Sequence, residues 1–110
     1  MKLWVDDVRP APDGYTWVKS VNEAKEAIWF CEDRFPSYVH PAKDMHIEIE
    51  LIDIDHDAGD YAQYGGDYIK LLDWFEETGR NYPIRIHSMN PVGVENMRRI
   101  IQKNGWTEVR

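Results

Sequence analysis

The chain has 110 residues, 43% of them hydrophobic and 30% charged, which is typical of one globular domain and predicts a single domain over residues 1–110. Its formal net charge of −7 argues against binding to long duplex nucleic acid, which requires a basic surface. No apolar stretch is long enough to span a membrane, and the early acids Asp6 and Asp7 are atypical of a signal peptide. The single cysteine favours a reducing compartment. We therefore expect a cytoplasmic protein without a membrane partner.

The first half of the chain predicts three strands and one helix. Short apolar runs at 2–5 and 15–19 favour strands, and the connection 8–14 is rich in proline and too short for the usual crossover helix. The range 20–34 predicts a helix, because it begins with a serine, a typical N-cap, and carries apolar residues at helical spacing. The stretch 45–54 predicts the third strand, where a shift in the apolar alternation suggests a bulge.

The second half of the chain predicts two further helices and two short strands. Apolar residues at helical spacing predict a helix over 67–77, and 84–87 is an apolar strand that follows a proline. Asn90 is a typical N-cap, and Pro91 suits the first position of a helix, where its missing N–H costs nothing. Residues 106–109 predict a short strand at the C-terminal edge of the sheet.

Strands that alternate with helices indicate right-handed crossovers and a mostly parallel sheet. We expect an α/β fold with about five strands in that sheet. In open sheets of this kind, ligands bind beyond the carboxyl ends of the strands. Polar clusters follow three predicted strands, at Asp6-Asp7, at Asp55-His56-Asp57 and at His87-Ser88-Met89-Asn90. Their shared position predicts one functional pocket.

The first two clusters bring up to four carboxylates to this pocket, from Asp6, Asp7, Asp55 and Asp57. Like charges this close raise each other's pKa or require a cation, and oxygen ligands suit Mg²⁺, Mn²⁺ or Ca²⁺. The alternative is that some of these acids cap turns and face water. Asp53, which lies within a predicted strand, is interpreted as a structural or solvent-facing acid.

Two histidines, His56 and His87, follow different strands at the predicted pocket. Imidazoles that titrate near neutral pH can act as acid and base on opposite sides of a phosphoryl group. Either histidine can instead be structural. His40 and His46 are expected at the opposite, N-terminal end of the sheet, so they are not assigned to the site.

The helix that begins at Asn90 and Pro91 would present free backbone N–H groups and its positive dipole end to the pocket, which together form a natural phosphate site. Ser88 can add a hydroxyl contact, and Arg9 can add a bidentate phosphate contact. In the alternative interpretation Asn90 is a helix cap, a role compatible with phosphate binding, and Arg9 is a surface charge.

Three segments of the chain together resemble the cyclic-phosphate-processing receiver-like domains, which are relatives of the response-regulator receiver domains. The segments are LWVDDVRP at 3–10, DHD at 55–57, and HSMNPVG at 87–93 followed by ENM at 95–97. The resemblance covers nearly the whole chain in the expected order. It implies a receiver-like, flavodoxin-like α/β sandwich of three layers, from which the usual first crossover helix is missing because the connection 8–14 is too short for it.

The resemblance also implies roles for individual positions. Asp6 and Asp7 match the acidic pair that holds a divalent ion in receivers. Asp55 or Asp57 matches the phosphoacceptor region, and the loop length leaves the choice open. Ser88 falls where receivers keep a switch threonine or serine. The lysine-proline step of receivers is absent and histidines accompany the acids, which favours a pocket that binds or hydrolyses a phosphate ester over phosphorelay signalling.

The leading hypothesis is a metal-dependent phosphoesterase that acts on a cyclic phosphate of a small molecule such as a nucleotide, or of an RNA terminus, with Mg²⁺ or Mn²⁺ as cofactor. One alternative is a receiver-type signalling or binding module with an aspartate phosphoacceptor and no turnover; another is an interaction protein with an acidic surface. The expected roles are catalysis for His56, His87 and Asp55, metal binding for Asp6, Asp7 and Asp55, and phosphate binding for Arg9, Ser88, Asn90 and Asp57.

Overall fold

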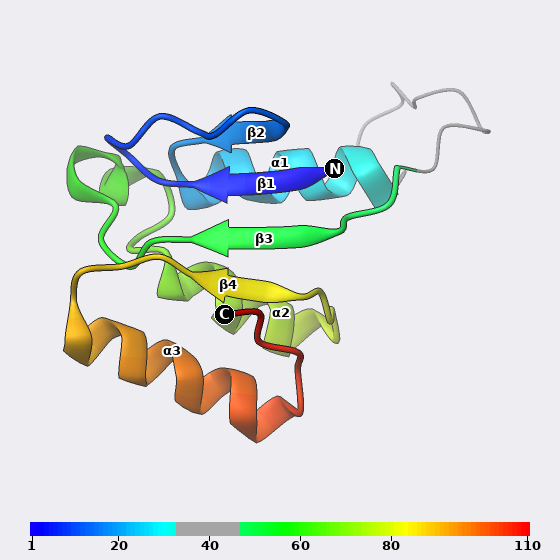
Figure 1. Ribbon diagram of the computed structural model, residues 1–110, viewed down its shortest axis with the longest axis vertical. Coiled ribbons are helices and arrows are strands. Elements are labelled where there is room, and N and C mark those ends of the chain that lie inside the picture. Colours follow the sequence, from blue (N-terminus) through cyan, green and yellow to red (C-terminus); the bar gives the residue numbers. More distant parts are fainter. Residues whose placement is uncertain (33–46) are drawn as a thin grey trace.

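A four-stranded parallel sheet forms the centre of the protein in the computed structural model, which describes residues 1–32 and 47–110. The strands lie in the order β2-β1-β3-β4, and every neighbouring pair is parallel (Figure 1). The elements in chain order are β1 (Lys2–Val5), β2 (Tyr15–Val18), α1 (Val21–Glu32), β3 (Leu51–Ile54), the 3₁₀ helix η1 (Gly59–Tyr64), α2 (Ile69–Thr78), β4 (Ile84–Ile86) and α3 (Pro91–Asn104).

This architecture confirms the expected receiver-like α/β fold with a parallel sheet. The missing first crossover helix is also confirmed, because residues 6–14 join β1 to β2 without a helix. The fifth strand expected at 106–109 is reduced to one isolated bridge between Ile84 and Glu108. The backbone of Ile84 bonds to this segment twice, because its N–H donates to the carbonyl of Thr107 and its carbonyl accepts from the N–H of Val109.

The third strand is shorter than the sequence predicts. It begins at Leu51 rather than at position 45, because the ladder between β1 and β3 starts at the pair Lys2 and Leu51. Ile49 is nevertheless buried, so the shift in apolar alternation marks the point where the regular strand begins. Positions 33–46 lie outside the described residues, and with them the predicted end of the first helix, the predicted start of the third strand, and both His40 and His46.

The described helices leave one face of the sheet uncovered. Helices α1 and α2 lie behind the sheet in Figure 1, and α3 runs along the β4 side and packs against α2. Among residues 1–32 and 47–110, no helix covers the side of the sheet that faces the viewer. The described structure therefore has two layers where three were expected, since the helix missing between β1 and β2 is not replaced.

Side chains alternate between the two faces of each strand, as the pleat requires. On β1, Leu3 and Val5 are fully buried under the helices, whereas Lys2 is exposed and Trp4 is half-buried on the other side. Partners in a parallel ladder share a face, so the register extends this pattern across the sheet. We call the uncovered side the open face; it carries Lys2, Trp4, Tyr15, Trp17, Asp53 and Arg85.

The core lies between the sheet and the helices. Ile52 and Ile54 of β3 are 0% exposed, as are Leu72 and Phe75 of α2. Ser20 caps α1 as the sequence predicts, because its hydroxyl accepts a hydrogen bond of 3.0 Å from the N–H of Glu23. In the part of the chain that the structure describes, no helix combines the length and the apolar character that crossing a membrane requires.

Truncation of the Ile52 side chain tests the assignment of the hydrophobic core. We expect Ile52→Ala to lower the free energy of unfolding by about 2–5 kcal/mol, because it leaves a cavity between the central strand and the helices. Val92→Ala is the control, since the Val92 side chain is exposed and its truncation should change stability by less than about 0.5 kcal/mol. Urea denaturation followed by circular dichroism measures both. Equal effects of the two substitutions would contradict the assigned core.

Candidate functional site

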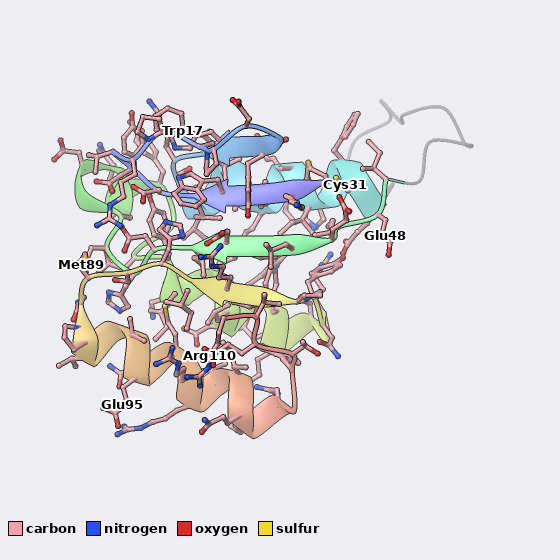
Figure 2. All side chains as sticks on the ribbon, in the orientation of Figure 1. Trp17, Cys31, Glu48, Met89, Glu95 and Arg110 are labelled. Carbon is pink, nitrogen blue, oxygen red and sulfur yellow. The ribbon has the colours of Figure 1, made fainter. Side chains whose placement is uncertain are left out.

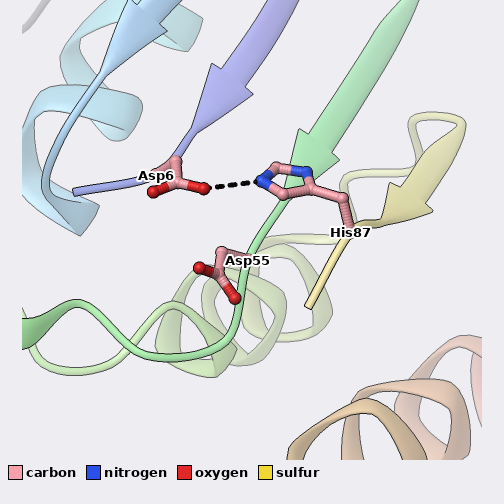
Figure 3. A group of neighbouring side chains, drawn as sticks. All are labelled: Asp6, Asp55 and His87. Atoms are coloured by element: carbon pink, nitrogen blue, oxygen red, sulfur yellow. Dashed lines mark hydrogen bonds and ion pairs between the residues drawn. The ribbon is translucent and has the colours of Figure 1, made fainter. Parts of the chain in front are cut away.

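Three polar side chains meet where parallel strands end. Asp6 follows β1, Asp55 follows β3 and His87 follows β4, and Figure 3 shows them around one point. One potential ligand atom from each of the three lies within 4.8 Å of the others. The register explains this, because Val5 pairs with Ile54 and the next residue of each strand emerges on the same edge. The segments that the sequence placed in one pocket thus converge.

Asp6 is the most constrained of these groups. It is 0% exposed, and its Oδ1 accepts hydrogen bonds from the backbone N–H groups of Val8 (3.0 Å) and Arg9 (2.9 Å). Burial alone would raise the pKa of Asp6, but the N–H groups of Arg9 and Val8 and the imidazole of His87 outweigh it and lower the pKa below its usual value. The carboxylate is therefore held in its charged form.

His87 lies between two carboxylates. Its Nε2 is 3.0 Å from Asp6 Oδ2, and its Nδ1 is 2.7 Å from Asp53 Oδ1. The imidazolium form can donate to both oxygens, whereas a neutral ring can donate to one only. The ring is also stacked on Trp4, with centroids 3.8 Å apart and planes 4° from parallel. This side chain is consequently fixed in position and orientation.

Asp53 belongs to the site as the partner of His87, a role that the sequence did not reveal. It is 0% exposed, so the solvent-facing interpretation is wrong and the structural one holds. Its Oδ2 accepts a hydrogen bond of 3.2 Å from the Tyr15 hydroxyl and lies 3.8 Å from Arg85 Nη1. The sequence signal that could have revealed this role is a carboxylate in an otherwise apolar strand, because a carboxylate that becomes buried there needs a hydrogen-bond partner.

Asp55 and Asp7 add negative charge around Asp6. Asp55 Oδ1 accepts a hydrogen bond of 2.7 Å from the N–H of His56. Asp7 is outside the group of three, and its Oδ2 faces Gly59, where an added Cβ would come within 2.4 Å of it. Burial raises the pKa of Asp7, and repulsion from Asp6 and Asp55 raises it further. A cation at this edge of the sheet would relieve that repulsion.

A second group of predicted residues lies at the start of α3. His56 Nδ1 is 2.9 Å from Asp57 Oδ1, and the Asp57 side chain is 60% exposed. Asn90 caps the helix, because its Oδ1 accepts a hydrogen bond of 3.0 Å from the N–H of Gly93. Its Nδ2 lies 3.4 Å from Asp57 Oδ2. Asp57 therefore links the loop after β3 to the helix start, whereas Asp55 lies beside Asp6.

Gly93 is another residue whose role the sequence did not reveal. A Cβ added there would lie 2.4 Å from Cγ and 2.8 Å from Nδ1 of His56. The missing side chain lets the imidazole rest against the first turn of α3. The HSMNPVG segment thus provides a helix cap at Asn90 and, at Gly93, the space in which the His56 ring approaches the helix.

Arg9 and Ser88 lie at the borders of the site. Arg9 Nη1 donates a hydrogen bond of 3.2 Å to the carbonyl of His87, so its guanidinium lies near the group formed by Asp6, Asp55 and His87. Ser88 Oγ accepts a hydrogen bond of 3.1 Å from the N–H of Asn90. An open cleft of about 480 Å³ borders the site through Ser88; it is lined by Ser88, Met89, Pro91, Val94, Glu95 and Arg98. The described geometry thus has an acidic centre with hydrogen-bond donors beside it.

Comparison with protein families gives one match. The family model described as the cyclic-phosphate processing receiver domain matches residues 1–103. No curated protein and no solved structure shows a significant match to the chain. The matched range includes both the acidic centre and the start of α3.

The contact between Gly93 and His56 can be tested by a double-mutant cycle. We expect Gly93→Ala to destabilise the protein by about 1–3 kcal/mol, because the new methyl group overlaps the imidazole. In the His56→Ala background the same substitution should cost at least about 1 kcal/mol less, since the ring is gone. Urea unfolding of the four proteins measures the coupling. Additive effects would show that the two residues do not touch.

Proposed function

We propose, on the premise that this chain belongs to the family of cyclic-phosphate processing receiver domains, that it is a metal-dependent phosphoesterase that opens a cyclic phosphate on a nucleotide or an RNA end. The observation that carries the proposal is the convergence of Asp6, Asp55 and His87, whose ligand atoms lie within 4.8 Å of one another. Hydrogen-bond donors for a phosphate flank this group at Arg9 and at the start of α3.

These residues fit a divalent ion. Two carboxylates and one imidazole are a typical donor set, and the lowered pKa of Asp6 keeps that ligand charged. When bound, the ion would offset negative charge on the phosphoryl oxygens. Because one donor is an imidazole nitrogen, we expect Mn²⁺ to bind more tightly than Mg²⁺, which prefers oxygen ligands. Asp7 would act from outside the group by adding negative charge.

Asp53 would act as a positioning residue for His87. A carboxylate that accepts the Nδ1–H of a histidine fixes the tautomer in which Nε2 can serve as a ligand. The distance of 2.7 Å between Nδ1 and Asp53 Oδ1 suits this role. The stacked Trp4 ring keeps the imidazole from turning away. In this proposal His87 binds and orients, and it is less suited to exchange protons because both ring nitrogens are engaged.

His56 would carry out the proton transfer. Asp57 holds its Nδ1, and among the described residues no hydrogen bond occupies its Nε2. In the proposed step a water oxygen attacks phosphorus, one ester P–O bond of the ring breaks, and a phosphate monoester forms. His56 Nε2 takes a proton from the water and then gives it to the leaving sugar oxygen, so His56 ends in its starting protonation state.

The phosphate would be held at the start of α3. Pro91 has no N–H, and the N–H groups of Asn90 and Gly93 bond to Ser88 Oγ and Asn90 Oδ1, so the N–H of Val92 and the helix dipole would favour an anion there. Asn90 supports this arrangement as a cap, since its Oδ1 is already bonded to Gly93. One guanidinium N–H of Arg9 donates to the His87 carbonyl, and the remaining N–H groups of the guanidinium can donate to phosphate oxygens. Ser88 can add its hydroxyl proton.

A receiver-type module without turnover is the second candidate. It is favoured by one observation: Asp55 is only partly buried and lies directly beside Asp6, as a phosphoacceptor next to a metal ligand would. Incubation with acetyl phosphate followed by mass spectrometry distinguishes the candidates. A stable adduct on Asp55 or Asp57 without hydrolysis of cyclic phosphates would favour the second.

The main test is hydrolysis of 2′,3′-cyclic nucleotides. We expect turnover with Mn²⁺ that a chelator abolishes. In Asp55→Asn, His87→Ala and His56→Ala we expect kcat/KM to fall by at least about 100-fold. Asp73→Asn is the matched control, because Asp73 is a half-exposed acid on α2 whose nearest cation is Lys70 at 3.9 Å. Chromatography of the products measures the rate. Unchanged turnover in the three site variants would refute the proposal.

The role of Asp53 leads to a separate prediction. We expect Asp53→Asn to weaken Mn²⁺ binding by about 10–100-fold, because the amide no longer stabilises the ligating tautomer of His87. Tyr15→Phe is the control; it removes one hydrogen bond to Asp53 but keeps the carboxylate, so its effect should be severalfold smaller. Calorimetric titration with Mn²⁺ measures both variants after circular dichroism has shown that they fold. Equal affinities in wild type and Asp53→Asn would exclude this positioning role.

A further inference from the structure

The open face carries a row of aromatic rings. Trp4 meets Tyr15 edge to face, with ring centroids 5.7 Å apart, and it stacks on His87 on its other side. Trp17 is the register partner of Trp4 on β2, and Figure 2 shows it at that edge of the sheet. All three aromatic residues are half-buried rather than covered. Rings therefore occupy two adjacent strands on the side without helices.

This row is continuous with the acidic centre. The His87 ring that stacks on Trp4 is the same ring whose Nε2 contacts Asp6. The indole N–H groups also bond to the loop that carries the site, from Trp4 to the carbonyl of Arg9 and from Trp17 to the carbonyl of Asp6. A chain-like ligand with one end at the site would therefore lie along these rings.

The same face carries cationic side chains although the whole protein is acidic. Lys2 Nζ lies 5.7 Å from the centre of the Tyr15 ring, and Lys19 Nζ lies 4.6 Å from that of Trp17. Arg85 has a half-exposed side chain on β4. The acid of this face, Asp53, is fully buried. Lys2, Lys19 and Arg85 thus place cationic groups beside the rings, which suits a polyanion.

We infer that the open face binds the last two or three nucleotides of a single-stranded RNA whose terminal 2′,3′-cyclic phosphate reaches the site at Asp6, Asp55 and His87. The inference rests on the proposed function and narrows its substrate from any cyclic phosphate to an RNA end. Aromatic rings on an open four-stranded sheet stack on unpaired bases, and cations beside them contact the phosphates. A cyclic phosphate at a strand end requires a 2′-hydroxyl, which specifies RNA.

The test uses fluorescence anisotropy with a 5′-labelled RNA hexamer that ends in a 2′,3′-cyclic phosphate. We expect the double variant Lys2→Gln/Lys19→Gln to bind at least about fivefold more weakly than wild type, with a salt slope reduced by about 1.4 for two lost cations. The matched control is Lys70→Gln/Lys103→Gln on α2 and α3, whose lysines are exposed away from the open face. This control should bind as wild type does.

A second measurement separates the two proposals. Hydrolysis of a cyclic mononucleotide should be equal in wild type and Lys2→Gln/Lys19→Gln, since neither lysine contacts the acidic centre. Hexamer binding without any hydrolysis would support the open face and refute the phosphoesterase. Hydrolysis of the mononucleotide with equal hexamer affinity in all variants would overturn the inference and leave the phosphoesterase intact. A wild-type dimer in sedimentation that the Lys2→Gln/Lys19→Gln variant loses would also overturn it, because a second copy would then occupy this face.

Discussion

The imidazole of His87 between Asp53 and Asp6 is the contact on which the rest of the site depends. Both carboxylates are 0% exposed, and buried charges are tolerated only when they are paired and hydrogen-bonded. His87 lies within hydrogen-bond distance of both, with Nδ1 2.7 Å from Asp53 Oδ1 and Nε2 3.0 Å from Asp6 Oδ2. Because the three residues belong to or follow β3, β1 and β4, this contact also ties three strand ends together. Without the ring, both buried carboxylates would lose a hydrogen-bond partner.

The short connection between β1 and β2 has two consequences. It turns at once after Asp6, whose Oδ1 accepts the N–H groups of Val8 and Arg9, and this turn directs Arg9 toward His87. It also contains no helix, so one side of the sheet stays open and the Trp4 ring is available to stack on His87. A longer crossover would cover that face. The same nine residues therefore shape the acidic centre and expose the aromatic surface beside it.

The parts of the site that sequence reasoning found are those fixed by local rules. Parallel strands end on one edge, which is why Asp6, Asp55 and His87 could be grouped from their positions after apolar runs, and the cap at Asn90 follows from residue type alone. Asp53 was left between a structural and a solvent-facing role because a lone acid in a strand is ambiguous; its partner His87 lies 34 positions away. The fifth strand was expected from the residue types at 106–109, and only tertiary contacts reveal that it is reduced to the single bridge between Ile84 and Glu108.

Electrostatics constrains how an anion can reach this site. Asp6, Asp7 and Asp55 gather negative charge at the strand ends, and the raised pKa of Asp7 is the consequence of burial together with repulsion from the other two. A phosphate ester that approached from this side would meet the same repulsion unless a cation lay between them. The accessible cations at Lys2 and Lys19 lie beside the rings of the open face instead. The distribution of charge thus favours a ligand that is attracted along the sheet first and meets the acidic centre only with its end.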